Sequence, residues 1–556
     1  MKKLLKLMGV FALVVGILTG CSSAPKEDAG DANTNTGTTA ANELVVAIGG
    51  EPTYLDPAIA GDAVSNYVTK QMYEGLFSVK PDGSLQNELC ESFTVSEDGL
   101  VYTYTLTDAN WSDGQPITAE DFVYGMKRSI AYGSADAYYG SFLTKTVKGG
   151  AEASAVVDAA GQVLIEELPE LGIKALDDKT LEITLEKPVP YFNQLLVQGA
   201  TYPIRSDFAE EKVSAWADSK DVPVSGAFMF ESRNANEEIV LVKNPNYRNA
   251  DQVTLEKITF KIMPDGVAQL NAFKAGELDF AMAPSPETAK TYEGKPELFT
   301  IDPYVINYFV TVNAGSNAPE ALQDANVRKA LSMAVDRDEL IAIIDAGDTY
   351  YPLYGFIPRG MAGVNGDFRE EQDAVLKLSD TNVEEAKALM ATAGYDETNP
   401  LTLTYYYNDS DLHRTVAQVL QEQWKRIGVN VELKTAEVRV FFDDRTNANF
   451  ELARHANSAD YLDPMIYLEM YMRAGQGTTK AVDDQKYEDL IAAANAESDP
   501  KVRLEKLHEA ENYFVNEMAY IIPLFGYTNP ELLRQGITGI ETSPDGAVNF
   551  RYTKVQ

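Results

Sequence analysis

Few side chains in this sequence occur in a pattern that performs covalent chemistry. The three histidines, His413, His455 and His508, are far apart and form no ligand-spaced cluster, so no zinc site is expected. The sequence contains no Gly-rich phosphate loop with Lys-Ser/Thr, no Cys-x-x-Cys, no His-Glu-x-x-His and no Gly-x-Ser-x-Gly. Its 84 acidic residues make any chosen carboxylate pair weak evidence for acid–base catalysis. We therefore expect no enzyme, no cofactor and no metal.

The first of the two cysteines, Cys21, closes a targeting segment. Three lysines precede an apolar run at 7–18, which is followed by Thr-Gly-Cys. A cationic start before a short apolar run is typical of a secretory signal, and the run is too short for a comfortable membrane span. The Leu-Thr-Gly-Cys ending resembles the bacterial lipoprotein signal, which implies cleavage after residues 1–20 and lipids on Cys21. The alternative is an ordinary cleaved signal with an incidental cysteine.

Composition constrains the chain beyond the signal. Residues 21–42 carry no aromatic or large aliphatic side chain, which predicts a flexible tether. The chain of 556 residues is too long for one core, so at least two domains are expected. A net charge of −37 makes nucleic acid a poor partner and mainly favours solubility. Cys90 is left without a partner, which predicts a buried, inert thiol rather than a nucleophile.

Hydrophobic periodicity predicts the elements that would position any site. A first half rich in strands precedes a region, from 313 onward, in which helices and strands alternate, and this alternation indicates a wound α/β domain. The expected strands are 44–48, a hairpin at 93–107, 181–185, 239–242, 255–262, 401–407, 429–433 and 520–525. The expected helices are 62–77, a helix capped by Thr118, 327–344, 381–393 with Thr381 as N-cap, 409–427, 483–494 and 500–517.

Five stretches resemble the oligopeptide-binding type of bacterial solute-binding protein, the extracytoplasmic receptor of ABC importers. The densest lies within 91–128, with Glu-Ser-Phe at 91–93, Tyr-Thr-Tyr at 102–104 and Trp-Ser-Asp-Gly-Gln-Pro-Ile-Thr-Ala-Glu-Asp-Phe-Val-Tyr at 111–124. The others are Leu-Asp-Pro at 55–57 with Tyr-Glu-Gly-Leu at 73–76, Lys-Asn-Pro-Asn-Tyr at 243–247, Val-Arg-Lys-Ala-Leu-Ser-Met-Ala-Val-Asp-Arg at 327–337, and Ala-Asp-Tyr-Leu-Asp-Pro at 459–464. They follow the family's order over nearly the whole chain after the signal.

The resemblance implies an α/β, two-lobed periplasmic-binding-protein-like fold of the large type, with the ligand cleft between the lobes. Lobe I would comprise 43–83, 221–312 and 527–556, with an inserted subdomain at 84–220. Lobe II would comprise 313–526. Hinge motion would close the lobes on the ligand.

The same resemblance assigns candidate ligand-binding residues. The amine-binding acid of the peptide-binding relatives is the aspartate of Ala-Asp-Tyr, which is Asp460 here. The residues before it, Ala456, Asn457 and Ser458, match the family's backbone-pairing stretch. Two arginines, Arg445 and Arg454, match positions that can meet a ligand carboxylate. Tyr139 and Phe525 or Tyr527 are looser matches to aromatic positions of the cleft wall. Asp460 could instead be an acid that caps a turn, and the two arginines could instead form surface ion pairs. The aromatic residues could instead pack in the core. Asn457 stands where members often carry Trp, which would widen a pocket.

These observations predict a lipid-anchored, monomeric receptor on the outer face of the cytoplasmic membrane, without enzymatic activity. It would bind short peptides and pass them to ABC permease subunits with their ATPases, since the chain has no nucleotide loop of its own. Relatives of this fold also bind nickel complexes, haem or sugars, and a receptor for signal peptides would look the same. An exported peptidase and a surface adhesin are the alternatives from other classes.

Overall fold

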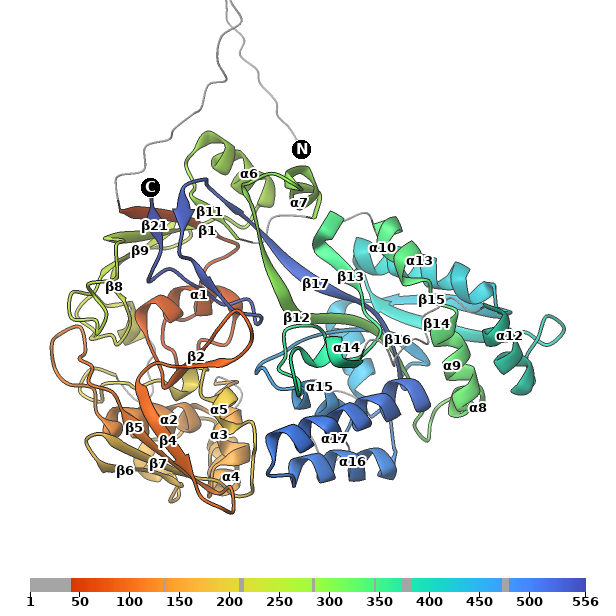
Figure 1. The fold of residues 1–556 in the computed structure, drawn as a ribbon, viewed down its shortest axis with the longest axis horizontal. Helices are drawn as coiled ribbons and strands as arrows, with labels where there is room; N and C mark the ends of the chain where they lie inside the picture. Colours follow the sequence, from red (N-terminus) through yellow and green to blue (C-terminus); the bar gives the residue numbers. More distant parts are fainter. Residues whose placement is uncertain are drawn as a thin grey trace, which may run out of the picture. The chain divides into compact units, whose positions relative to one another are not determined.

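The computed structural model describes residues 42–133, 137–209, 215–282, 286–344, 347–372, 383–472 and 480–556. Most of its strands belong to one 11-stranded sheet with the order β15-β14-β16-β12-β17-β11-β1-β10-β9-β8, and β13 pairs with β17 (Figure 1). Its strands are β1 (Glu43–Ile48), β8 (Phe228–Asn234), β9 (Glu238–Lys243), β10 (Lys257–Ile262), β11 (Phe280–Ala281), β12 (Leu298–Val312), β13 (Tyr350–Pro352), β14 (Leu401–Asn408), β15 (Val429–Ala436), β16 (Leu452–Ser458) and β17 (Ile521–Leu533).

Two long strands, β12 and β17, lie side by side in the middle of this sheet (Figure 1). They pair antiparallel from Leu298 opposite Leu532 to Thr311 opposite Ile521, with several register shifts. Strand β17 runs through the predicted lobe boundary at 526/527, and β12 ends at the boundary at 312/313. Strand β17 therefore belongs to both predicted lobes, whereas β12 belongs to predicted lobe I alone, and the lobe boundaries stay a prediction.

The predicted inserted region contains a separate sheet with the order β4-β5-β7-β6. Its strands are β4 (Cys90–Val95), β5 (Val101–Leu106), β6 (Ile173–Asp177) and β7 (Thr180–Thr184), and the predicted hairpin at 93–107 is confirmed by the antiparallel pairing of β4 with β5. Helix α2 (Ala119–Tyr132) follows Thr118 as predicted, and the Asp121 carboxylate accepts hydrogen bonds from the Thr118 N–H (2.9 Å) and hydroxyl (3.1 Å). This sheet and helix share a core that includes Trp111, and Cys90 is buried as predicted.

The predicted helix at 327–344 is two helices, α9 (Ala325–Met333) and α10 (Arg337–Ile344). The break has a local cause, because Asp336 turns its carboxylate to the Glu339 N–H (2.9 Å) and caps a new helix. The predicted alternation beyond 313 is confirmed where α13 (Asp411–Lys425) connects the parallel strands β14 and β15. The predicted N-cap Thr381 lies outside the described residues.

The remaining elements are short or lie at the edges of these cores. The helices are α1 (Ala63–Met72), α3 (Gly140–Thr146), α4 (Gly150–Ala160), α5 (Phe192–Leu195), α6 (Gly266–Ala275), α7 (Pro286–Tyr292), α8 (Glu320–Gln323), α11 (Phe368–Gln372), α12 (Val383–Thr392), α14 (Val438–Thr446), α15 (Met465–Leu468), α16 (Gln485–Asn495) and α17 (Pro500–Asn512), which continues into a π-helical turn at Tyr513–Glu517. The strands are β2 (Phe77–Val79), β3 (Leu85–Asn87), β18 (Ile537–Thr538), β19 (Glu541–Thr542), β20 (Val548–Asn549) and β21 (Lys554–Val555).

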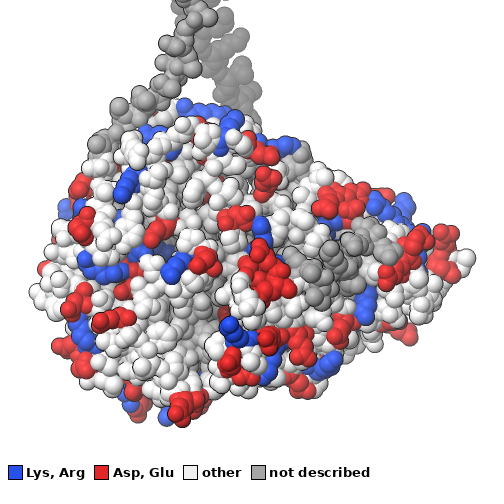
Figure 2. Space-filling view, in the orientation of Figure 1, with Lys and Arg blue, Asp and Glu red and all other residues white. Residues whose placement is uncertain are grey.

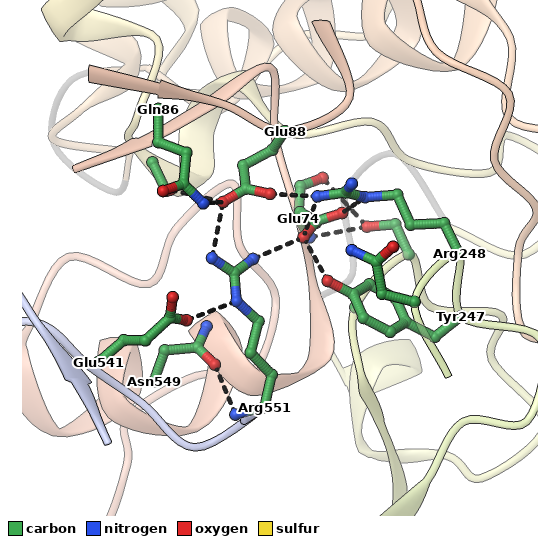
Figure 3. Close-up of polar contacts among 12 residues, drawn as sticks. Glu74, Gln86, Glu88, Tyr247, Arg248, Glu541, Asn549 and Arg551 are labelled. Atoms are coloured by element: carbon green, nitrogen blue, oxygen red, sulfur yellow. Dashed lines mark hydrogen bonds and ion pairs between the residues drawn. The ribbon is translucent and has the colours of Figure 1, made fainter. Parts of the chain in front are cut away.

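A buried network of charges holds the carboxyl-terminal segment against the residues around β2 and β3 (Figure 3). Arg551 donates to Glu74 (2.8 Å), Glu88 (2.7 Å) and Glu541 (2.6 Å). Arg248 donates to Glu74 (2.7 Å) and also to Glu88. The network joins residues more than 450 positions apart, so it stabilises a contact that no local sequence pattern encodes.

On the face drawn in Figure 2, the acidic side chains are spread out rather than gathered in one site. They occur in small groups with basic side chains between them. No group of three or more His, Cys, Asp or Glu in the described ranges could hold a metal ion. A search of the same residues finds no helix with the length and apolarity needed to cross a membrane.

Candidate functional site

Strand β16 offers an open edge with which an extended ligand could pair. It pairs antiparallel with β12, where Asn313 donates to Glu451 (2.9 Å) and Ala459 to Val305 (3.2 Å). These bonds turn the odd-numbered residues of β16 toward β12, so the even-numbered residues turn their N–H and C=O groups to the opposite edge. In the described part of the chain, β14 covers that edge only at Leu452 and Ala453. The backbone of Arg454, Ala456 and Ser458 therefore faces an uncovered edge.

Asp460 lies just beyond the carboxyl end of this edge. Its carboxylate accepts a hydrogen bond from the Tyr138 hydroxyl (2.9 Å), and its carbonyl accepts one from the Gln198 amide. Burial raises the pKa of Asp460, while the Tyr138 hydrogen bond and the charge of Lys145 act in the opposite direction. No ion pair to Asp460 is formed within the described ranges, so a cation that reaches this carboxylate would be bound strongly.

A polar cavity of about 160 Å³ adjoins Asp460. Two further predicted residues, Tyr139 and Ser458, line it together with Gln198 and Lys70. Tyr139 belongs to the loop before α3, so the predicted inserted region and the end of β16 meet here. The structure thus brings Asp460, Ser458 and Tyr139 to one cavity.

Arg454 lies at the other end of the open edge. Its side chain is only 8% exposed, and its Nε (2.7 Å) and Nη2 both donate to the Asn408 amide oxygen at the end of β14. The hydrogen-bond partner of this guanidinium is thus a neutral amide, and no carboxylate of the described residues forms an ion pair with it. A buried cation without a nearby anion is costly, so this guanidinium is suited to bind an incoming carboxylate.

Arg445 on α14 adds a second positive charge. The guanidinium carbons of Arg445 and Arg454 lie 4.9 and 5.8 Å from the centre of the Phe442 ring. Burial, together with the charge of Arg454, lowers the pKa of Arg445 to about 10. Burial and Arg454 also lower the pKa of His413 to about 4, and the His413 ring lies 3.0 Å from the Tyr308 hydroxyl. The local field therefore favours a negative ligand group.

The other predicted residues lie at different depths. Phe525 is fully buried and stacks on Tyr308 with ring centres 4.8 Å apart, so it packs in the core rather than lining the cleft. Tyr527 is partly exposed and packs on Tyr350. Asn457 donates its N–H to the Asn307 side chain (3.1 Å), which places it on the β12 side of the strand. Cys21 lies outside the described residues.

Sequence reasoning missed several residues that the structure brings to the site. Tyr138 contacts Asp460 across 322 positions, and Asn408 contacts Arg454 across 46. Phe442 packs near the guanidinium of Arg445, and His413 lies close enough to Arg454 for that charge to lower its pKa. Tyr138, beside the predicted Tyr139, could have been found as its neighbour; the sequence offered no signal for the partners of Arg454.

The fold and this site define a class: an α/β binding protein in which two long paired strands, β12 and β17, form the middle of the large sheet beside an open, charged strand edge. A profile of the bacterial extracellular solute-binding proteins, family 5 Middle, matches residues 84–479. The chain therefore belongs to this family of bacterial solute-binding proteins, and the predicted resemblance is confirmed.

Individual relatives agree with this assignment. The periplasmic oligopeptide-binding protein OppA of Escherichia coli K12 is 31% identical over 88% of this chain and 88% of its own length. The unliganded open form of the periplasmic murein tripeptide binding protein MppA matches with a TM-score of 0.80 at 27% identity, covering 93% of this chain and 98% of that chain. Haemophilus influenzae OppA in complex with RPPGFSPFR matches with a TM-score of 0.68 at 25% identity, covering 93% and 99%. The predicted two-lobed fold class is confirmed.

Proposed function

We propose that this chain is an extracytoplasmic receptor that captures short peptides and delivers them to the permease subunits and ATPases of an ABC importer. The observation that carries this proposal is the open edge of β16, with the Asp460 carboxylate at one end and the Arg454 guanidinium at the other. A peptide with free ends has the complementary charges, an ammonium and a carboxylate. The relatives named as oligopeptide- and murein tripeptide-binding proteins support the same ligand class.

The geometry also supports one orientation of the peptide. Its ammonium would bind Asp460 and its carboxylate Arg454, so its backbone would run antiparallel to β16 as an added strand. The six residue-to-residue steps from 454 to 460 span about 20 Å at ~3.3 Å per step, and the arginine side chain covers part of that length. The ligand would therefore have about four to six residues. Recognition through the constant parts of the peptide does not depend on the side chains in its middle.

The receptor would act without covalent chemistry. The described residues around the open edge offer a carboxylate, two guanidiniums and amides, which bind charges and backbone. An exported peptidase on the same scaffold is tested by incubating the protein with a peptide mixture and measuring the masses. A receptor returns the peptides intact, whereas shortened products would show a hydrolase.

Lipid anchoring belongs to this proposal as well. Cys21 would carry the lipids, residues 21–42 would form the tether, and the receptor would act as a monomer on the outer face of the cytoplasmic membrane. Expression of the full chain beside a Cys21→Ser variant tests this. The parent should sediment with membranes and carry an added lipid mass, and equal release of both chains would contradict the anchor.

Calorimetric titration with one five-residue peptide in three forms tests the site. The forms have free ends, an acetylated amine or an amidated carboxyl. Each blocked end should weaken binding by tenfold or more, since each removes a charge-assisted contact worth about 1.5–3 kcal/mol. Asp460→Asn should abolish the penalty of acetylation alone, and Arg454→Met the penalty of amidation alone.

Two matched features make the result decisive. Each variant serves as the control for the other, because each should leave the opposite end of the peptide recognised. Urea midpoints equal to that of the parent would show that the binding changes are local. A parent protein that binds none of the three forms, or binds all three equally, would refute the proposed function.

A further inference from the structure

An apolar stripe on α14 leads to the arginine end of the open edge. Val438, Phe442 and Arg445 are spaced i, i+4 and i+7, so they lie along one face of the helix. Val438 is 44% and Phe442 40% exposed, whereas the neighbouring Phe441 is fully buried. The exposed ring is therefore not part of the core of this region.

The position of the Phe442 ring ties it to the carboxylate end of the ligand. The ring centre lies 5.8 Å from the guanidinium carbon of Arg454 and 4.9 Å from that of Arg445. A carboxyl carbon bound to a guanidinium lies about 4 Å from the guanidinium carbon. The last side chain of a peptide leaves the chain one bond from that carboxyl group. It would therefore reach the exposed face of Phe442.

We infer that this receptor prefers peptides whose last residue is large and apolar, and that Phe442 sets this preference. The inference rests on the proposed function, because it names the ligand class of that same site. The carboxylate would neutralise the guanidinium of Arg454, and the last side chain would cover the ring that is otherwise exposed to water. An aromatic last residue gains most, because paired rings add to the free energy of burial.

The chemistry also defines the competing preference. Two guanidiniums beside the last residue would equally attract an acidic side chain, which would bind as a second carboxylate. The exposed ring favours the apolar choice, because an acidic last residue would leave Phe442 in water. The two preferences predict opposite orders of affinity.

Calorimetric titration of the protein with three five-residue peptides tests the inference. The peptides are alanine throughout, except for a last residue that is phenylalanine, serine or aspartate, and both ends are free. The phenylalanine-ended peptide should bind the parent about tenfold more tightly than the serine-ended one, which is the size of one aromatic contact with its burial. Phe442→Ser should reduce that ratio to about twofold, while the serine-ended peptide keeps its affinity.

Val440→Ser is the matched control. Val440 is 53% exposed on the same helix, but it is two positions from Phe442 and therefore lies on the opposite helix face. Its loss should leave the ratio of the affinities for the phenylalanine- and serine-ended peptides unchanged. Equal binding of the phenylalanine- and serine-ended peptides by the parent would overturn the inference while leaving the proposed function in place. Tighter binding of the aspartate-ended peptide, or a ratio unchanged in Phe442→Ser, would overturn it too. Failure of all three peptides to bind would remove the proposed function with it.

Discussion

Replacing Arg551 with methionine should destabilise the protein strongly, although Arg551 lies five residues from the end of the chain. Its guanidinium is 6% exposed and forms ion pairs with Glu74, which is 8% exposed, and Glu88, which is 1% exposed. Methionine keeps most of the volume of the side chain and removes its charge. Glu74 and Glu88 would then share Arg248 as their remaining cationic partner in the network of Figure 3.

The expected loss is about 3–5 kcal/mol in the free energy of unfolding, which is typical when one partner of a buried ion pair is removed. The pH dependence has its origin in the same contacts. Burial and the repulsion of Glu88 raise the pKa of Glu74, and Arg551 lowers the pKa of Glu88 against its burial. Without Arg551 both pKa values rise. A carboxyl group whose folded-state pKa lies above its unfolded value binds protons better when folded, so the loss should shrink as the pH falls from 7.5 to 5.

Urea titration followed by circular dichroism, on the parent and the variant at both pH values, measures this loss. Arg414→Met is the matched control, because Arg414 is 46% exposed and pairs with Asp409 and Asp411 at the surface. Its removal should cost less than about 1 kcal/mol. Equal urea midpoints for the two variants, or an Arg551→Met deficit that grows toward pH 5, would refute the reasoning.

Two further predictions concern single titrating groups. Burial raises the pKa of the Cys90 thiol to about 12. In a Cys21→Ser chain, an aromatic disulfide reagent at pH 8 should therefore label Cys90 only after unfolding in urea. Rapid labelling of the folded chain would contradict this prediction. Burial, together with the charge of Arg454, lowers the pKa of His413 to about 4, below the unfolded value of about 6.5. The unfolded chain therefore binds this proton better, and the free energy of unfolding should fall as the pH drops from 6.5 to 4. His413→Gln should lose less stability over that interval, and an imidazole NMR signal of His413 that titrates near 6.5 would show the prediction to be wrong.

Local patterns predicted the elements whose cause is local. The alternation of β14, α13 and β15 was predicted because apolar residues repeat with the period of a helix between two buried runs. The break between α9 and α10 was missed because Val327 to Leu340 keeps one periodicity across it. Asp336 caps the start of a second helix, and the periodicity of apolar residues does not reveal a cap within a continuous run.

The residues of the candidate site that belong to a sequence motif were predictable, whereas those that only tertiary structure brings together were not. Asp460 was found from Ala-Asp-Tyr, whereas the edge before it is open only because β14 stops pairing at Ala453. The end of one strand relative to another depends on tertiary pairing, which the sequence does not state. The aromatic residue Phe525 was a looser match to the family's cleft wall, and it packs in the core, because a buried and a cleft-lining aromatic residue have the same sequence signal.

Strand β17 lies between β12 and β11, so it is the middle of the large sheet although it is one of the last strands to be made. A ribosome produces the chain from its amino terminus, and the sheet therefore lacks its centre until residues 521–533 have emerged. Until then β11 and β12 each keep an unpaired edge, which can pair with other chains. Stable folding of the sheet is thus postponed to the end of synthesis, and a product that stops before β17 should be prone to aggregate.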